Sequence, residues 1–241
     1  MQWIDDGIVL GTRNHGESSV VLELFTREHG RHLGLVRGGR SRRLQPLLQP
    51  GNSVHATWNA RLDEHLGAFV VEGTVSRAAR LMESRIGLAG LTHLATLARL
   101  MPEREPHQGL YEAILMIADA LPDATIAAPL MVRFELEVLQ DLGFGLDLTE
   151  CAATGATDDL IYVSPKSGRA VCREAGAPWA DKLFRLPLFL TGSGPVTSGD
   201  VADAFELTGY FLDHRIFEPR GIALGDARRT FSQLVGLDKS R

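Results

Sequence analysis

The sequence predicts an α+β protein in which a small N-terminal β-barrel precedes a mostly helical region that carries an inserted loop module. Three observations support this prediction. Short β-rich runs occupy the first 75 residues, apolar residues recur at helical spacing after them, and a later segment rich in Gly, Ser and Thr shows neither period. We therefore expect a barrel domain at 1–77, a helical domain at 78–241 and a loop module at 144–176 within it.

Five short runs of β-branched and apolar residues predict the strands of the barrel. Glycine-containing turns at 14–17 and 28–30 separate the first three runs. The runs are Gly7–Gly11, Ser19–Phe25, Arg31–Val36, Ser53–Trp58 and Gly67–Glu72. Five strands at hairpin spacing are typical of a small closed or partly open barrel such as an OB-fold, and the edge of a five-stranded sandwich is the alternative.

Helical periodicity begins at Ser76, which is a candidate N-cap for a helix that Pro102 terminates. The expected apolar face of this helix consists of Leu81, Leu88, Leu91, Leu94 and Ala98. Further helices are expected at 108–121, from Pro129 to Gly143, at 198–217 and at about 226–235. We interpret these apolar faces as core rather than as a binding groove.

Positive charge is concentrated near the N-terminus, although the whole chain has a formal net charge of −5. Residues 1–80 hold 10 Lys and Arg against 8 Asp and Glu, whereas residues 81–241 hold 15 against 22. A local positive field is enough to attract phosphate, and a solvated charge run is the alternative. The candidate phosphate-binding residues here are Arg31, Arg37, Arg40, Arg42 and Arg43.

The sequence gives no indication of an enzyme, of a membrane-spanning protein or of a secreted protein. The sequence has no Gly-Lys dipeptide for a P-loop, no nucleophile elbow, no His-Glu-x-x-His and no dinucleotide fingerprint, so we do not expect an enzyme. No apolar run approaches the length that spans a membrane, and no signal peptide is visible. Two cysteines do not suggest a disulfide framework, which favours a cytoplasmic protein.

The loop module holds Cys151 and Cys172, each where a zinc ribbon would hold a Cys-x-x-Cys pair. Thr154 and Ala175 occupy the other two positions and supply neither thiolate nor imidazole, so we expect no cofactor and regard zinc as doubtful. The module also adds the basic candidates Lys166, Arg169 and Arg173. Either they share one phosphate-binding path with the N-terminal arginines, or the two clusters face different ways.

Three segments in the same order resemble the RecO family of bacterial recombination mediators. The first is Trp3–Gly11 with the Gly16-Glu17 pair and Phe25–Gly30, which resembles the N-terminal barrel. The second is Val36–Arg43 with Leu48–Gly51, which resembles the family's basic loop and Leu-Gln-Pro turn. The third is Leu142–Cys151 with Val163–Val171, which resembles its passage from helix to ribbon. Together they extend over nearly the whole chain.

The resemblance implies an OB-fold followed by a helical domain, and a role in recombinational DNA repair. It implies binding of single- and double-stranded DNA, annealing of complementary strands, and work with RecR, and often RecF, to load RecA onto DNA covered by single-strand-binding protein. It also implies that the helical domain receives the acidic, apolar C-terminal tail of that protein, in a cytoplasmic, nucleoid-associated setting. Some family members carry a four-cysteine ribbon, of which only Cys151 and Cys172 remain here.

The physical expectation is that basic loops at the rim of the barrel follow the phosphate backbone without reading sequence. His32 and Trp58 are weaker candidates for stacking against bases, and Trp58 is better explained as core. Two alternatives stay open. One is an OB-fold RNA-binding module, and the other is a scaffold in which the arginines pair with the acidic domain.

Overall fold

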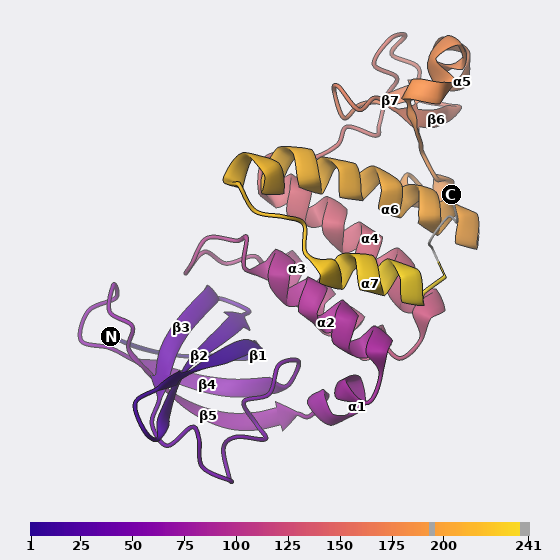
Figure 1. Ribbon diagram of the computed structural model, residues 1–241. Coiled ribbons are helices and arrows are strands. Elements are labelled where there is room, and N and C mark those ends of the chain that lie inside the picture. The colour runs from indigo at the N-terminus through magenta and orange to yellow at the C-terminus, as the bar shows by residue number, and fades with distance from the viewer. Residues whose placement is uncertain (193–195, 237–241) are drawn as a thin grey trace. The chain divides into compact units, whose positions relative to one another are not determined.

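The computed structural model describes residues 1–192 and 196–236, and the chain divides into two compact units, Met1–Asp123 and Ala124–Arg241 (Figure 1). Strands dominate the beginning of the chain and helices the remainder, which confirms the predicted order of the two kinds of structure. The predicted boundary at 77/78 marks the change from strands to helices, while the first compact unit continues to residue 123. None of the helices in the described residues is long and apolar enough to cross a membrane.

Five strands close into a barrel in the order β1-β2-β3-β5-β4. They are β1 (Gln2–His15), β2 (Ser19–Thr26), β3 (Gly30–Val36), β4 (Ser53–Asn59) and β5 (Ala68–Val75). The first strand is much longer than the predicted 7–11, because its first half pairs with β4 and its second half with β2. A register shift between Val9 and Gly11 accompanies this change of partner, and a parallel pairing of β3 with β5 closes the barrel.

The barrel core follows from the alternation of side chains along each strand. In β3, buried and half-buried residues alternate without exception, as expected when one face of a strand is packed and the other is not. The buried core residues are Val9, Val20, Leu22, Leu24, Val36, Leu48, Val54, Ala56, Trp58, Phe69 and Val71. Leu48 is the one member that comes from a connection between strands, so the long β3–β4 connection is packed against the barrel rather than looped away from it.

The predicted continuous helix from Ser76 to Pro102 is wrong in two respects. The structure has a short α1 (Ala78–Met82) and a separate α2 (Arg85–Ala98). The chain breaks because Ser84 becomes an N-cap, its hydroxyl accepting a hydrogen bond from the Gly87 amide at 3.2 Å. Leu88, expected on the apolar face, is 53% exposed. The next helix, α3 (Gln108–Ala120), matches its prediction closely.

A buried arginine joins the barrel to these helices. The Asn52 side chain accepts from the amides of Arg77 and Ala78, at 2.8 and 2.9 Å. The Arg77 guanidinium donates to the Ser53 hydroxyl at 2.7 Å and to both carboxylate oxygens of Asp119 at 2.7 and 3.0 Å. Because these bonds connect the start of β4 with α3, the barrel and the first three helices form one packed unit.

The second unit is built on α4 (Ala124–Asp141), α6 (Ser198–Leu212) and α7 (Asp226–Leu234). The predicted start of α4 at Pro129 is wrong, since the helix begins five residues earlier. Proline in the second turn removes only one intrahelical hydrogen bond, and its fixed φ suits a helix. Arg228 of α7 bonds Glu135 of α4 and the Phe205 carbonyl of α6, which holds the three helices together.

The loop module contains a small sheet in the order β7-β6-β8. Its strands are β6 (Leu160–Val163), β7 (Ala170–Cys172) and β8 (Phe184–Arg185), and the short α5 (Arg173–Gly176) follows β7 directly. The third strand of the sheet therefore lies beyond the predicted end of the module at 176.

Candidate nucleic-acid interface

The arginines between β3 and β4 lie on a loop, residues 37–43, that we call the basic loop. Gly38 has a φ of +65°, in the left-handed region that favours glycine, which lets the chain turn sharply out of β3. The Arg40 amide donates to the Ser18 carbonyl at 3.0 Å, and its guanidinium donates to the Glu17 carbonyl at 2.8 Å. These bonds fix the basic loop to the β1–β2 turn, at one end of the barrel.

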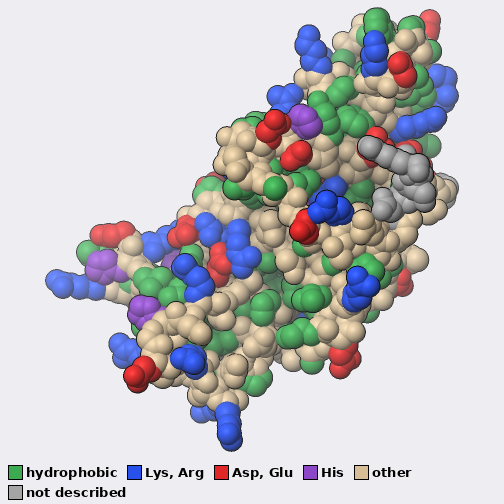
Figure 2. Space-filling model, viewed as in Figure 1, with side chains coloured by type: hydrophobic (Ala, Val, Ile, Leu, Met, Phe, Trp, Pro, Cys, Tyr) green, Lys and Arg blue, Asp and Glu red, His purple; other side chains and the backbone are tan. Residues whose placement is uncertain are grey.

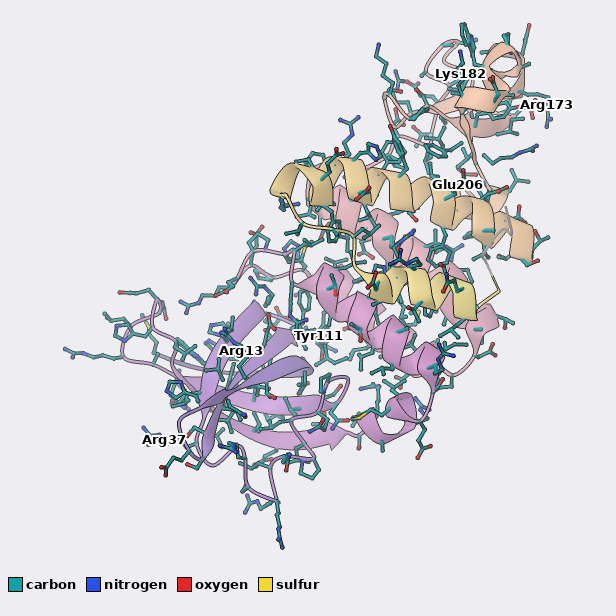
Figure 3. The ribbon with its side chains drawn as sticks, viewed as in Figure 1. Arg13, Arg37, Tyr111, Arg173, Lys182 and Glu206 are labelled. Atoms are coloured by element: carbon teal, nitrogen blue, oxygen red, sulfur yellow. The ribbon has the colours of Figure 1, made fainter. Side chains whose placement is uncertain are left out.

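The positive charge of the basic loop is not neutralised nearby. Its four arginines are all exposed: Arg37, Arg40, Arg42 and Arg43. Within the part of the chain that the structure describes, none of them makes an ion pair. Arg37 projects from the barrel in Figure 3, and Figure 2 shows further basic side chains on the barrel region. The loop therefore presents a local positive potential to solvent.

A polar hollow of about 320 Å³ lies beside Arg40. Its polar lining consists of Thr12 and Asn14 of β1 with Gln45 and Gln49 of the β3–β4 connection. Hydroxyl and amide groups donate hydrogen bonds to phosphate oxygens, and no carboxylate is among the described residues that line the hollow. The surface beside the basic loop is thus chemically suited to a sugar–phosphate backbone.

Arg31, another predicted phosphate ligand, is occupied by partners inside the first unit. Its side chain is 17% exposed and bonds Glu23 at 3.0 Å and Glu103 at 3.4 Å. It also donates to the Met101 carbonyl at 3.1 Å, while Arg99 bonds the other oxygen of Glu23 at 2.8 Å. This geometry makes Arg31 a link between the strands and the connection that follows α2.

Arg13 is a basic residue that the sequence interpretation missed. It is exposed near the end of β1, on the barrel in Figure 3, and makes no ion pair with any described residue. It lines a hollow of about 420 Å³ together with Arg31 and Arg99 on the outer face of β1, β2 and β3. An isolated arginine in a strand lacks the clustering that marks the basic loop, so the sequence offered no signal for it.

The basic residues of the loop module are only partly available. Lys166 is exposed, and Arg169 pairs with Asp147 at 3.1 Å and with Glu150 at 2.7 Å. Arg173 forms a two-point contact with Asp159, with both nitrogen–oxygen distances at 3.0 Å. Two of the three positive charges are therefore locally balanced by acids, in contrast to the basic loop.

The two cysteines of the module lie together. The Cys172 amide donates to the Cys151 sulfur at 3.3 Å, and the Thr154 hydroxyl is 3.6 Å from the Cys172 sulfur. Burial opposes ionisation of Cys151, but hydrogen bonds from the Cys172 amide, from Thr154 and from the Ala153 amide outweigh it and lower the pKa of this thiol to about 6.

This donor set does not fit a structural zinc site. Tetrahedral zinc takes four Cys, His or carboxylate ligands, and here a hydroxyl, that of Thr154, stands beside the two sulfurs. No group of three His, Cys, Asp or Glu side chains that could hold a metal ion occurs among the described residues.

The two weaker stacking candidates are both buried. Trp58 is 1% exposed and belongs to the barrel core, as its core interpretation predicted. His32 is 3% exposed, and burial lowers its pKa to about 4, so the imidazole is neutral near pH 7. Neither ring is displayed on the outer surface of the barrel.

Comparison with known proteins decides the family. The model "Recombination protein O N terminal" matches residues 1–77, and the model "Recombination protein O C terminal" matches residues 82–221. The chain belongs to the RecO family. The N-terminal RecO model ends where the strands end, so it corresponds to the barrel.

Curated relatives match this chain over nearly their full length. A DNA repair protein RecO from Methylobacterium nodulans is 60% identical over 245 residues, covering 99% of both chains. One from Bradyrhizobium sp. is 57% identical over 244 residues, covering 100% of this chain and 98% of its own. One from Sinorhizobium medicae is 58% identical over 232 residues, covering 96% and 93%. The protein is thus a member of a DNA repair family, and these names state no catalytic reaction.

Proposed function

We propose that this RecO-family chain is a DNA-binding recombination mediator that holds single- and double-stranded DNA through the basic loop of an OB-fold barrel. The single observation that supports the proposal most strongly is the basic loop itself. The loop carries four exposed arginines without acidic partners, and the amide and guanidinium of Arg40 tie it to the β1–β2 turn of a closed five-stranded barrel.

The chemistry of this surface fits binding to the backbone rather than to particular bases. Arginine forms charge-assisted, two-point hydrogen bonds with phosphate, and the neighbouring hydroxyl and amide groups add neutral donors. Backbone contacts of this kind neutralise phosphate charge on either strand of a pair. A surface that binds two complementary strands in this way accelerates their annealing, which is the activity we assign to the chain.

The domain roles and partners extend the same proposal. Residues 1–77 form the nucleic-acid-binding domain, residues 78–241 the helical domain, and residues 144–176 a module similar to a zinc ribbon without its metal. With RecR, and in some settings RecF, the protein loads RecA onto DNA covered by single-strand-binding protein, whose C-terminal tail binds the helical domain. We place this activity in the cytoplasm, at the nucleoid.

In this proposal the basic residues of the loop module contribute less to DNA binding than the basic loop does. These residues are Lys166, Arg169 and Arg173. Because Asp147, Glu150 and Asp159 pair with the two arginines, the module attracts phosphate less strongly than the basic loop does. A Lys166→Ala variant should therefore weaken DNA binding less than any single substitution in the basic loop.

Annealing of complementary oligonucleotides tests the proposal. The wild-type chain should accelerate annealing of bare strands and of strands covered by single-strand-binding protein. The Arg40/Arg42/Arg43→Ala variant should lose most of this acceleration, and Arg80/Arg85/Arg220→Ala, which removes three exposed arginines elsewhere, should retain it. A basic-loop variant that anneals as fast as wild type would refute the role of the loop. Preference for RNA over DNA would favour the RNA-binding alternative, and absence of any binding at physiological salt would favour the scaffold.

A further inference from the structure

A cluster of aromatic rings lies at the other end of β1 from the basic loop. Trp3 of β1 stacks on His29 of the β2–β3 turn, with ring centroids 4.1 Å apart and planes 9° apart. Trp3 also lies near Trp58 of β4, at 5.6 Å and 17°, and His32 of β3 meets Trp58 edge-on at 4.9 Å. The stack therefore begins in the buried core and ends at His29, whose side chain remains 35% exposed.

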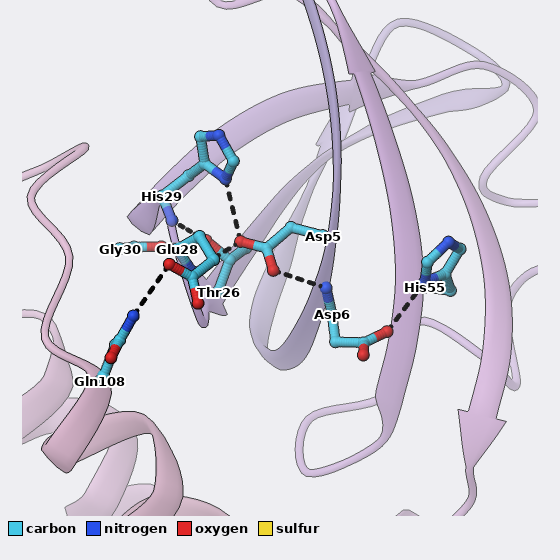
Figure 4. Close-up of polar contacts among 8 residues, drawn as sticks. All are labelled: Asp5, Asp6, Thr26, Glu28, His29, Gly30, His55 and Gln108. Atoms are coloured by element: carbon cyan, nitrogen blue, oxygen red, sulfur yellow. Dashed lines mark hydrogen bonds and ion pairs between the residues drawn. The ribbon is translucent and has the colours of Figure 1, made fainter.

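A buried carboxylate fixes the outer ring of this stack. One oxygen of Asp5 accepts the His29 imidazole at 3.0 Å and the Glu28 amide at 2.8 Å, and the other accepts the Asp6 amide at 2.8 Å (Figure 4). Because Asp5 is 7% exposed and bonded on both oxygens, the His29 ring has little freedom to turn. One face of the imidazole covers Trp3, and the exposed part of the ring faces away from it.

A pocket of about 460 Å³ opens beside these rings. This volume falls in the range of sites that hold small aromatic ligands. Its lining combines Trp3, His29, His32 and Trp58 with three charged side chains, Glu28, Asp63 and Arg104. The Arg104 guanidinium lies 5.9 Å from the Trp58 ring and donates to the carbonyls of Asp63 and His65.

Charge separates this pocket from the basic loop. The carboxylates of Glu28 and Asp63 are matched by the Arg104 guanidinium and the Met1 ammonium, so the pocket lacks the excess positive charge of the basic loop. One oxygen of the Glu28 carboxylate accepts from the Gln108 side-chain amide at 2.8 Å, which holds this carboxylate in place (Figure 4). Carboxylates accept hydrogen bonds from exocyclic amino groups, such as N4 of cytosine, and the aromatic rings offer stacking surface.

We propose that the pocket lined by Trp3, His29, Glu28, Asp63 and Arg104 binds an unstacked nucleobase of single-stranded DNA, with preference for bases that carry an exocyclic amino group. This inference rests on the proposed DNA-binding function and adds a second contact to it. The basic loop binds backbone on any nucleic acid, whereas the pocket admits only bases that are free of a duplex. Binding at both places makes the barrel sensitive to whether DNA is paired.

Intrinsic fluorescence of the full-length chain provides the test. The sequence has three tryptophans, and Trp179→Phe leaves only Trp3 and Trp58, both at the pocket. This variant would be titrated with a labelled thymine-only oligonucleotide and with one in which cytosine replaces alternate thymines. Label anisotropy measures binding while tryptophan fluorescence reports stacking. Tryptophan emission should be quenched as the complex forms, and more strongly for the cytosine-containing strand.

Substitutions of pocket residues test base binding separately from any general effect on the fold. His29→Ala should reduce affinity for single-stranded DNA at least about fivefold, the lower end of what one stacked base contributes, and leave affinity for duplex DNA unchanged. Asp63→Asn with Glu28→Gln should remove the preference for cytosine. His55→Ala is the matched control, because His55 is a half-exposed histidine on β4 that pairs with Asp6 and lies outside the pocket (Figure 4).

The results distinguish failure of the base pocket from failure of the proposed DNA-binding function. DNA binding by anisotropy without quenching, or equal loss of single-stranded and duplex binding in His29→Ala, would overturn the base pocket and leave the proposed function intact. Absence of any DNA binding by the wild-type chain would overturn both.

Discussion

Replacing Arg228 with methionine removes the cation that joins the three main helices of the second unit. The guanidinium donates to the two oxygens of Glu135 at 2.7 and 3.0 Å, to the Phe205 carbonyl at 2.7 Å and to the Thr208 hydroxyl at 3.2 Å. Thr208 also donates to Glu135. The Glu135 side chain is fully buried and that of Arg228 is 12% exposed, so the substitution leaves a buried carboxylate without its cation.

The expected cost is about 3–5 kcal/mol of unfolding free energy, the range found when one partner of a buried ion pair is removed. At about 2–4 °C per kcal/mol, this corresponds to a fall in melting temperature of roughly 6–20 °C. Thermal and urea unfolding followed by circular dichroism would measure it. Removing both charges with Arg228→Met and Glu135→Leu should recover much of the loss, because no buried charge is then left alone.

Arg229→Ala is the control, since Arg229 and its partner Asp226 are 69% and 87% exposed and such pairs contribute about 0–1 kcal/mol. If Arg228→Met costs no more than Arg229→Ala, the ion pair does not hold the helices together and the reasoning from burial fails.

Three further predictions follow from single contacts in the structure. The hydrogen bond from Arg77 lowers the pKa of Asp119 below its unfolded value near 3.8. This pair therefore stabilises the fold fully above the unfolded pKa and loses its effect as pH falls through the lower, folded pKa. Asp119→Asn should flatten that part of an acid-unfolding curve. Gly30→Ala should destabilise far more than Gly16→Ala in urea unfolding, because both glycines have positive φ but only a Cβ at Gly30 would collide with backbone, that of residue 105. The thiolate absorbance that disappears in Cys151→Ser should titrate near pH 6 in the wild type; titration at the ordinary thiol pKa would contradict the hydrogen-bond argument.

The positions of the strands were predictable because each contains a run of β-branched and apolar residues, and glycine-containing turns separate the first three, the turn at Gly30 being the clearest case. The break between α1 and α2 was not predictable, because apolar residues keep their helical spacing on both sides of Glu83 and Ser84. Only the capping hydrogen bond between Ser84 and Gly87 separates the two helices. Local periodicity cannot show that Ser84 will prefer a capping role over a helical one.

For the candidate site, the sequence showed where arginines are concentrated, but it could not show which of them pair with acidic residues. Arg31 and Arg37 look alike in a cluster of arginines, yet Arg31 is bonded to Glu103, which lies far away along the chain. The aromatic pocket is a second feature that the sequence could not show. Trp3 and His29 are far apart in sequence, and the antiparallel pairing of β1 with β2 brings their rings together.

The most direct test of the account is the salt dependence of DNA binding, measured by fluorescence anisotropy with labelled single-stranded DNA. It compares the wild-type chain with Arg40/Arg42/Arg43→Ala and with the control Arg80/Arg85/Arg220→Ala. If the basic loop is the backbone-binding site, its variant should bind more weakly, with a log–log salt slope smaller by about 0.7 for each phosphate that the loop no longer neutralises, while the control keeps the wild-type slope. Equal slopes for all three proteins, or no binding by the wild type, would contradict the assignment of the basic loop as the DNA-binding surface.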